Sequence, residues 1–388
     1  MTSCRRRCRG RGKVPLPTVK QVVLYDVVLR FREPMVTGWG TLKERETLLV
    51  EVRDAEGGEG WGEGVAFAGP WYTEETVQTS WYVLSEFLIP RVLGVSFAHP
   101  DEIGSRMAPI RGHRMAKAGL EGAAWDLFSR SLDQSLSHTL GGSRRRVAVG
   151  VTLGISEPRR LVDQVAGYLE QGYARVKVKV KPGQDRDLLA AVRARYPRLD
   201  LTADANAGYG RGDFDRLASL DDFGLTMLEQ PLSASDWLGH RDLARRLRTP
   251  ICLDESIASL DDARLAIELD SAAVMNIKYG RVGGTAAAVA IHQLCVDHQL
   301  PAWAGGMFES GVGKAHALAL SALPGMTLPA DLGASSRYWV ADVVHPELQV
   351  KQGWMEVPDR PGIGVTVNRR ALRALTVHQQ TFPAPHHM

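Results

Sequence analysis

Residues Arg175 to Gly183 read RVKVKVKPG, with Lys177, Lys179 and Lys181 at every second position and valines between them. In an extended strand successive side chains point to opposite faces, so the lysines share one face and the valines the other. A helix-like stretch precedes this segment, a Pro-Gly pair follows it, and similar short apolar segments recur downstream. That context is typical of a parallel sheet buried on both faces, which raises the question of what the lysines do inside it.

The chain after Arg146 alternates short apolar segments with stretches of helical period such as EPRRLVDQVAGYLEQG. The apolar segments, which we interpret as eight strands separated by seven helices, are VAVGVTLG, ARVKVKV, LDLTADAN, LTMLEQP, PICLDES, AVMNIKY, LPAWAGG and MTLPADL. Strands that alternate with helices form right-handed crossovers in a parallel sheet, and eight of them can close into a barrel. A doubly wound open sheet is the competing fold, but no G-x-G-x-x-G or Walker lysine follows a predicted strand. We therefore predict an α/β barrel.

The first part of the chain has a different pattern. Three segments, 21–31, 45–55 and 60–69, have the pattern of a strand meander, and Thr73–Leu93 and His113–Leu132 have that of helices. We expect an α+β capping domain there. The expected division of the chain is a basic, disordered tail at 1–19, the capping domain at 20–145, the barrel at 146–340, and a C-terminal segment at 341–388 that returns to the cap and has a flexible end.

Composition limits the classes of function. The chain of 388 residues is 44% hydrophobic and 23% charged, as in ordinary soluble proteins. No apolar run approaches the roughly 18 residues that span a bilayer, and the first residues lack a signal-peptide pattern, so we expect a cytoplasmic protein without a membrane partner. Cys4 and Cys8 lie in the tail, and Cys252 and Cys295 stand singly in apolar surroundings, so no disulfide framework is predicted.

The basic character of the chain is local. The formal net charge is +3, and the tail MTSCRRRCRGRGK carries six basic residues, so the rest of the chain is at 3 − 6 = −3. A basic arm can contact nucleic acid or anionic lipid, but this one has neither aromatic residues between its arginines nor an amphipathic period. We expect no nucleic-acid partner. The alternative is a protein that acts on nucleic acid through this tail, and unchanged activity after deletion of residues 1–13 would exclude it.

Three predicted strands end in an acidic residue: Asp204 in LTADAN, Glu229 in MLEQP and Asp254 in CLDES. Active sites of such barrels lie at the carboxyl ends of the strands, where these side chains converge. Helix N-caps or salt bridges explain single acids at strand ends, but not three consecutive ones as readily. Oxygen ligands held close together suit a hard divalent cation, Mg²⁺ or Mn²⁺.

Two lysines end the second and sixth predicted strands, Lys179 and Lys278. Strands four apart stand on opposite sides of an eight-stranded barrel, so these ammonium groups are expected to face each other across the acids. We expect partial burial and neighbouring cations, among them Lys177, to lower their pKa towards neutrality, as a general base requires. Such an arrangement can remove a proton next to a carboxylate and stabilise the resulting enediolate. Lys181 is expected to be solvated.

These residues resemble a known family, the enolase superfamily, and within it the branch of o-succinylbenzoate synthases and N-acylamino acid (N-succinylamino acid) racemases. The resemblance spans about residues 20 to 370. It rests on the K-x-K of strand two, DAN, EQP and DES at the acids, NIKYGRVGG, and GGMFESGVGKAH.

The resemblance implies a (β/α)7β TIM-like barrel with an α+β cap, and it implies Mg²⁺, with Mn²⁺ or another divalent cation as an alternative. By resemblance, the metal ligands are Asp204, Glu229 and Asp254, and the acid/base pair is Lys179 and Lys278. Substrate contacts and residues that orient the site are expected from Lys177, Asn206, Thr152, Glu255, Arg281, Met307 and Glu309.

The resemblance implies two related activities on a small-molecule carboxylate. One is dehydration of 2-succinyl-6-hydroxy-2,4-cyclohexadiene-1-carboxylate to 2-succinylbenzoate in menaquinone biosynthesis, and the other is racemisation of N-succinylamino acids. Arg281 occupies a position that goes with racemisation in this branch, although a surface arginine is an equally good interpretation. A homo-oligomer is expected. Gly333 and Ala207 depart from the branch, which leaves substrate contacts near them open. A barrel that only binds, without catalysis, is disfavoured because no expected catalytic residue is missing.

The cap contributes two segments, FREPMVTGWG at 31–40 and GPWYTEET at 69–76, that match mobile loops of the family. Their glycines permit such movement. Phe31, Trp39 and Trp71 either close over the site or simply pack.

Overall fold

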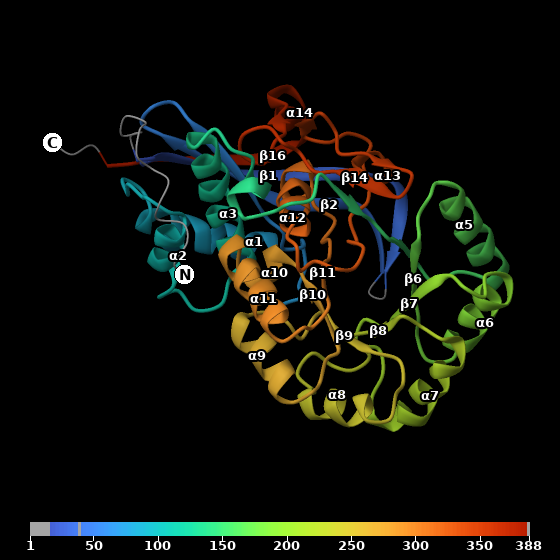
Figure 1. The fold of residues 1–388 in the computed structure, drawn as a ribbon. Coiled ribbons are helices and arrows are strands. Elements are labelled where there is room, and N and C mark those ends of the chain that lie inside the picture. Colours follow the sequence, from blue (N-terminus) through green and yellow to red (C-terminus); the bar gives the residue numbers. More distant parts are fainter. Residues whose placement is uncertain (1–15, 38–39, 386–388) are drawn as a thin grey trace.

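The barrel is visible in Figure 1 as a curled sheet with helices α5 to α9 in an arc outside it. This computed structural model describes residues 16–37 and 40–385. The expected basic tail with Cys4 and Cys8, except for its last residues, and Trp39 of the first cap segment lie outside the described residues.

Seven strands form the parallel sheet of the barrel, in the order β11-β10-β9-β8-β7-β6-β5. Neighbours in sequence are neighbours in space, as right-handed crossovers require. Their bounds are β5 Val151–Leu153, β6 Arg175–Lys179, β7 Asp200–Asp204, β8 Met227–Glu229, β9 Ile251–Leu253, β10 Val274–Ile277 and β11 Ala302–Ala304.

The eighth predicted strand closes the barrel without forming a regular strand. Residues 326–331 make isolated parallel bridges to both edges of the sheet, Ala302↔Met326 and Gly305↔Asp331 on one side and Val149↔Ala330 on the other. The amide of Ala330 donates to Ala148 O at 2.9 Å, and Ala330 O accepts from the amide of Gly150 at 2.8 Å. The (β/α)7β barrel is therefore confirmed, with a short closing segment in place of a full strand.

Most of the helices that cover the outside of the barrel pack on it through one apolar face. In α5, for example, Leu161 and Val165 are buried four residues apart, and Pro158 lies at the start, where a missing N–H costs nothing. The barrel helices are α5 Pro158–Glu170, α6 Asp185–Arg195, α7 Phe214–Ala218, α8 Trp237–Ala244, α9 Leu260–Glu268, α10 Tyr279–Val282, α11 Thr285–Asp297 and α12 Gly311–Ser321, and short 3-10 turns at Arg211–Asp213 and Ser219–Phe223 flank α7.

The cap is built on an antiparallel sheet in the order β16-β1-β2-β3. Its strands are β1 Val19–Thr37, β2 Gly40–Asp54, β3 Glu59–Gly64 and, from the end of the chain, β16 Thr376–Pro383. Helix α3 (Arg114–Ser131) packs on β3 so closely that a Cβ on Gly62 would lie 2.0 Å from Gly119 O. Helix α3 also contacts the barrel, because Glu121 accepts hydrogen bonds from the amides of Thr285 and Ala286 at the start of α11.

The first predicted cap helix, Thr73–Leu93, is shorter and irregular. It divides into α1 Val77–Val83, a π turn at Leu84–Leu88 and a 3-10 turn at Ile89–Arg91, where Pro90 interrupts the helix. The remaining elements are α2 Asp101–Met107, which the sequence pattern did not indicate, α4 Leu136–Thr139, β4 Arg146–Ala148, α13 Ser335–Tyr338, β12 Val344–His345, β13 Val350–Lys351, β14 Trp354–Glu356, β15 Thr366–Val367 and α14 Arg369–Leu375. None of the described helices has the length and apolar character needed to cross a membrane.

Candidate active site

The parallel register brings the predicted acids to one edge of the barrel. Lys179 pairs with Asp204 across β6 and β7, and Asp204 pairs with Glu229 across β7 and β8. Glu229 pairs with Cys252 of β9, so Asp254, two residues further along, points to the same face. All three acids are buried. Strand order alone therefore places these side chains together.

Lys177 is the centre of a buried charge network in the barrel. Its ammonium lies 2.9 Å from Glu229 Oε2, 2.9 Å from Asp331 Oδ2 and 3.4 Å from Asp204 Oδ2. The ring centroid of Trp303 lies 5.1 Å from the same nitrogen. Burial alone lowers the pKa of Lys177, but Asp331, Glu229 and Asp204 together raise it well above its usual value. Lys177 is thus held as a cation, which answers why a lysine lies inside the sheet.

Lys179 lies two residues after Lys177, at the carboxyl end of β6. Its Nζ is 3.2 Å from Asp204 Oδ2 and also donates to Asn206 Oδ1. Asn206 in turn donates from Nδ2 to Glu255 Oε1 at 3.2 Å. Asn206 has a positive φ of 42°, a conformation that asparagine tolerates better than most residues. These contacts place Asn206 and Glu255 beside the acids, and their role in orienting the site stays a prediction.

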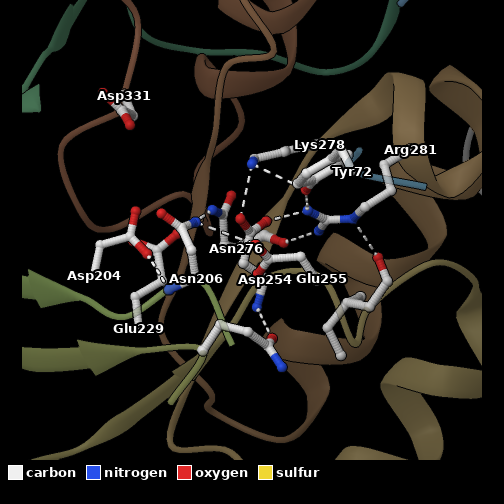
Figure 2. Close-up of polar contacts among 12 residues, drawn as sticks. Tyr72, Asp204, Asn206, Glu229, Asp254, Glu255, Asn276, Lys278, Arg281 and Asp331 are labelled. Atoms are coloured by element: carbon white, nitrogen blue, oxygen red, sulfur yellow. Dashed lines mark hydrogen bonds and ion pairs between the residues drawn. The ribbon is translucent and has the colours of Figure 1, made fainter. Parts of the chain in front are cut away.

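Lys278 and Arg281 both point at Asp254 (Figure 2). The Lys278 ammonium is 2.8 Å from Asp254 Oδ2 and donates to the hydroxyl of Tyr72 at 3.2 Å. Arg281 contacts Asp254 Oδ1, donates to the same Tyr72 hydroxyl at 2.9 Å, and holds Ile257 O at 2.8 Å. With a residue exposure of 2%, Arg281 is not the surface arginine that was the alternative interpretation.

The expectation that the pKa of both lysines is lowered towards neutrality is wrong for Lys278. Burial is the largest single influence and acts to lower its pKa, and Arg281 adds to that effect. Asp254 at hydrogen-bond distance, together with Tyr72 and Glu255, outweighs them and raises the pKa of Lys278 above its usual value. The sequence could not show this contact, because it depends on the orientation of the Asp254 side chain.

The chemistry of the donor set fits a divalent cation. Among the described residues no three acidic, cysteine or histidine side chains converge on one point, because Asp204, Glu229 and Asp254 are each turned to a lysine or arginine. Burial, with the charges of Asp204 and Asp254, raises the pKa of Glu229 to about 7 although Lys177 opposes the shift. Such crowded carboxylate oxygens are ligands that Mg²⁺ prefers. Their role as metal ligands stays a prediction.

Two buried oxygens beside these acids have no hydrogen-bond partner, Glu255 Oε2 and Asn276 Oδ1. Asn276 of β10 donates from Nδ2 to Glu229 Oε1 at 2.9 Å, so it orients one candidate ligand. Buried polar atoms are normally paired, and their presence at this edge indicates a site built for a further polar group.

A cavity joins the predicted residues. Its walls include both lysines of the predicted acid/base pair, two of the three acids, and Thr152, Lys177, Asn206, Met307 and Glu309. Thr152 donates to Asp331 at 2.8 Å and is therefore already engaged. Met307 packs with Val65 and Phe67 of the cap, so cap and barrel close the cavity together. Glu229, Glu255 and Arg281 lie outside the lining.

Sequence reasoning missed four residues of this site: Tyr72, Asn276, Asp331 and Lys314. Asp331 ends the eighth predicted strand, and its position at a carboxyl end was the available signal. Asn276 shares the inward face of its strand with Lys278, two residues on. Tyr72 lies in the predicted loop 69–76, but the sequence did not single out this residue, because its partners are more than 200 residues away. Of the predicted cap aromatics, Phe31 packs on Phe308 and Trp339, whereas Trp71 is 55% exposed.

Comparison with known proteins agrees with this architecture. Residues 160–371 match the model of the family described as "Enolase C-terminal domain-like". Residues 19–141 match the model described as "Mandelate racemase / muconate lactonizing enzyme, N-terminal domain". A solved structure of an enolase superfamily member from Listeria innocua superposes with a TM-score of 0.93 at 36% identity, covering 95% of this chain and all of that one.

Curated relatives extend over nearly the whole chain. An o-succinylbenzoate synthase from Geobacillus stearothermophilus is 47% identical over 365 residues, covering 94% of this chain and 97% of the relative. An N-succinylamino acid racemase from Thermus thermophilus is 43% identical, covering 93% of this chain and 97% of the relative. The barrel, the cap and these relatives together show that the chain belongs to the enolase superfamily.

Proposed function

We propose that this protein is an o-succinylbenzoate synthase that dehydrates 2-succinyl-6-hydroxy-2,4-cyclohexadiene-1-carboxylate to 2-succinylbenzoate in menaquinone biosynthesis. One observation carries the proposal: Lys179 and Lys278, from different strands, line a single cavity together with Asp204 and Asp254. Synthases at 39% to 47% identity over most of the chain support the substrate.

The candidate ligands of Mg²⁺ are Asp204, Glu229 and Asp254. The metal, when bound, supplies positive charge to a substrate carboxylate that becomes doubly negative as the α-proton leaves. Lys177 adds a fixed cation below these acids, and Asn276 fixes the orientation of Glu229. These residues thus stabilise charge that develops next to the carboxylate.

The two lysines carry the proton transfers. In the proposed synthase reaction Lys179 Nζ, as the free amine, takes the α-proton, and the electron pair of that C–H bond forms the enediolate. The pair then expels the hydroxyl group, which leaves as water with the proton that Lys179 returns. Lys278, held as a cation by Asp254 and Tyr72, faces the developing negative charge.

Racemisation of N-succinylamino acids is the second candidate activity. One arrangement favours this activity. Lys278 donates to Asp254 and Tyr72, and Arg281 holds the same Tyr72 hydroxyl. Lys278 is therefore as firmly positioned as Lys179. One lysine would remove the α-proton while the other delivers a proton to the opposite face. A racemase from Amycolatopsis at 44% identity over 346 residues supports this activity.

A two-substrate assay tests the proposal. We expect Mg²⁺-dependent turnover of the cyclohexadiene carboxylate, and slower or comparable racemisation of N-succinylamino acids. Lys179→Ala should lower kcat about 100- to 10,000-fold on both substrates, the range that general acid/base groups contribute. Lys278→Ala should abolish racemisation and retain α-proton exchange on one enantiomer. The matched control is Lys181→Ala, an exposed lysine of the same segment.

Unimpaired turnover by the Lys179→Ala variant would contradict the proposal. Synthase turnover with no racemisation of any N-succinylamino acid would remove the second activity only. Cytoplasmic location, a homo-oligomeric state and the absence of nucleic-acid and membrane partners stay predictions.

A further inference from the structure

Lys314 is a buried lysine that the proposed proton transfers do not use. It is the fourth residue of α12, a helix whose residues are all buried, and its own exposure is 2%. Its ammonium donates to Ser335 Oγ at 3.1 Å and lies 5.7 Å from the centroid of the Tyr338 ring. An ammonium group has three N–H donors, so one hydrogen bond leaves it incompletely satisfied.

The charge of Lys314 has no direct counterpart in the described part of the chain. Burial lowers the pKa of Lys314, and Asp342, Glu309 and Glu63 oppose this from a distance, but no carboxylate forms an ion pair with its Nζ. Lys177 differs sharply, because three carboxylates surround it.

The nearby acids do not pair with Lys314. Glu63 accepts from Ser310 Oγ at 2.6 Å and from the amide of Gly313 at 2.9 Å. Asp342 Oδ1 accepts from the amide of Gly311 at 2.8 Å, and Asp342 Oδ2 has no hydrogen-bond partner. Burial raises the pKa of Glu309. Because the Lys314 ammonium donates to Ser335 and forms no ion pair with these acids, it can bind an anion.

Lys314 lines the same cavity as Lys179 and Lys278. It enters from a different part of the wall, formed by α12 and the segment after the barrel closure, where Gly333 and Tyr338 also line the cavity. A Cβ on Gly333 would lie 2.3 Å from the Tyr338 ring, so this wall is packed and shaped rather than loose. The candidate metal ligands, by contrast, enter from the strand ends.

We propose that Lys314 binds a second carboxylate of the substrate, distal to the one that reacts, so that the site selects dicarboxylates. This inference rests on the proposed function and deepens it, because both candidate substrates carry a succinyl carboxylate. The reacting carboxylate lies toward Asp204, Glu229 and Asp254, and the succinyl carboxylate lies against the Lys314 ammonium.

The physical reason is the cost of an unpaired buried charge. A buried ammonium that meets a carboxylate forms a charge-assisted hydrogen bond, whereas a neutral acyl chain leaves its donors unsatisfied. Hydrogen bonds to charged groups correspond to a factor of roughly 10 to 100 in binding. We expect this factor in KM more than in kcat, since the contact lies away from the reacting carbon.

The first test needs no variant. Wild-type kcat/KM is compared for N-succinyl-L-phenylalanine and N-butyryl-L-phenylalanine, in which a methyl group replaces the distal carboxylate. We expect a preference of at least about tenfold for the succinyl compound, mostly in KM. Equal kcat/KM values would overturn the proposal.

The second test uses Lys314→Met, which keeps the length of the side chain and removes its charge. We expect the ratio of kcat/KM between the two substrates to fall towards one, because KM rises for the succinyl compound far more than for the butyryl compound. Lys181→Met, an exposed lysine, is the matched control for charge removal. Equal losses on both substrates would indicate a structural role and overturn the proposal.

A binding measurement separates this inference from the proposed function. If the wild-type protein turns over neither substrate class, the proposed function fails. Calorimetry with Mg²⁺ present then compares 2-succinylbenzoate with 2-butyrylbenzoate, in which a methyl group replaces the distal carboxylate. Tighter binding of the first compound by wild type, lost in Lys314→Met, supports a dicarboxylate site. Equal binding of the two compounds by wild type overturns it, even if the variant does not fold.

Discussion

Tyr72 of the cap accepts a hydrogen bond from Lys278 of the barrel, with 3.2 Å between Oη and Nζ. The same hydroxyl accepts from Arg281 at 2.9 Å, and the Lys278 ammonium lies 5.1 Å from the centroid of the Tyr72 ring. A cap residue thus fixes the position of one of the two proposed acid/base lysines. The hydrogen bonds of Lys179 go instead to two barrel residues, Asp204 and Asn206.

Tyr72→Phe should therefore impair one lysine and not the other. Removing the hydroxyl leaves Lys278 and Arg281 each without one acceptor, and a lost hydrogen bond to a charged group corresponds to a factor of about 10 or more. We expect α-proton exchange in D2O to slow about tenfold for the enantiomer that faces Lys278, and to change less than about twofold for the other. The Lys278→Ala variant identifies which enantiomer is which.

The control for this experiment is Tyr209→Phe. It removes a buried hydroxyl that donates to Asp185 at 2.8 Å, and neither residue lines the cavity. Equal slowing on both enantiomers in Tyr72→Phe would show that the hydroxyl acts on the cap as a whole rather than on Lys278.

Addition of Mg²⁺ should stabilise the protein. A ligand that binds the folded state adds RT ln(1 + [L]/Kd), about 2.7 kcal/mol at a concentration of about 100 times Kd. Binding also relieves the repulsion among Asp204, Glu229 and Asp254. Tm should therefore rise with Mg²⁺ in the wild type, and this rise should disappear in Asp204→Asn.

Thermal scans across a Mg²⁺ titration measure this effect. Asp163→Asn, an exposed aspartate of α5, should respond to Mg²⁺ as the wild type does. An unchanged Mg²⁺ response in Asp204→Asn would exclude this aspartate as a ligand.

The sequence predicted the parts of the site that local spacing determines. Asp204, Glu229 and Asp254 were predictable because each ends an apolar segment, and parallel strands bring such ends to one edge. Tyr72 and Lys314 were not, because their roles depend on contacts between distant segments. The eighth strand was predicted as regular, but Pro329 lacks the N–H that a full ladder needs, so the segment makes only isolated bridges.

In the cap, too, the contacts between elements could not be predicted from the sequence. The strand meander was predictable from alternating residues, but the exact lengths of β1 and α1 were not. Gly62 carried no signal of its own, although the structure shows why no other residue fits there: its Cα faces the backbone of α3, and an added Cβ would lie 2.0 Å from Gly119 O.

Gly62→Ala should accordingly be strongly destabilising. Backbone cannot move aside as a flexible side chain can, so β3 and α3 must separate, and overpacking of this kind costs about 1 to 3 kcal/mol. We expect a lower Tm than that of wild type. Gly104→Ala is the matched control, because Gly104 lies in α2 with nothing within 4 Å of an added Cβ, and it should be neutral or slightly stabilising. Equal Tm values for the two variants would contradict the close packing.

Asp26 makes the stability of the cap depend on pH. Burial raises the pKa of Asp26 from 3.8 to about 6, and Glu46 on the neighbouring strand adds to the shift. An acid whose pKa is higher in the folded state contributes stability at low pH, and this contribution is lost as the pH rises through about 6. Asp26→Asn mimics the protonated form at every pH.

The variant should therefore be more stable than wild type, and the difference should grow by roughly 1 kcal/mol from about pH 5 to about pH 8. Thermal scans at both pH values measure it, with the exposed Asp163→Asn as control. Glu46→Gln should reproduce part of the gain, because it removes the neighbouring charge that adds to burial. A Tm difference between Asp26→Asn and wild type that is the same at both pH values would mean that Asp26 does not titrate in this range, and that the gain comes from the amide's own contacts.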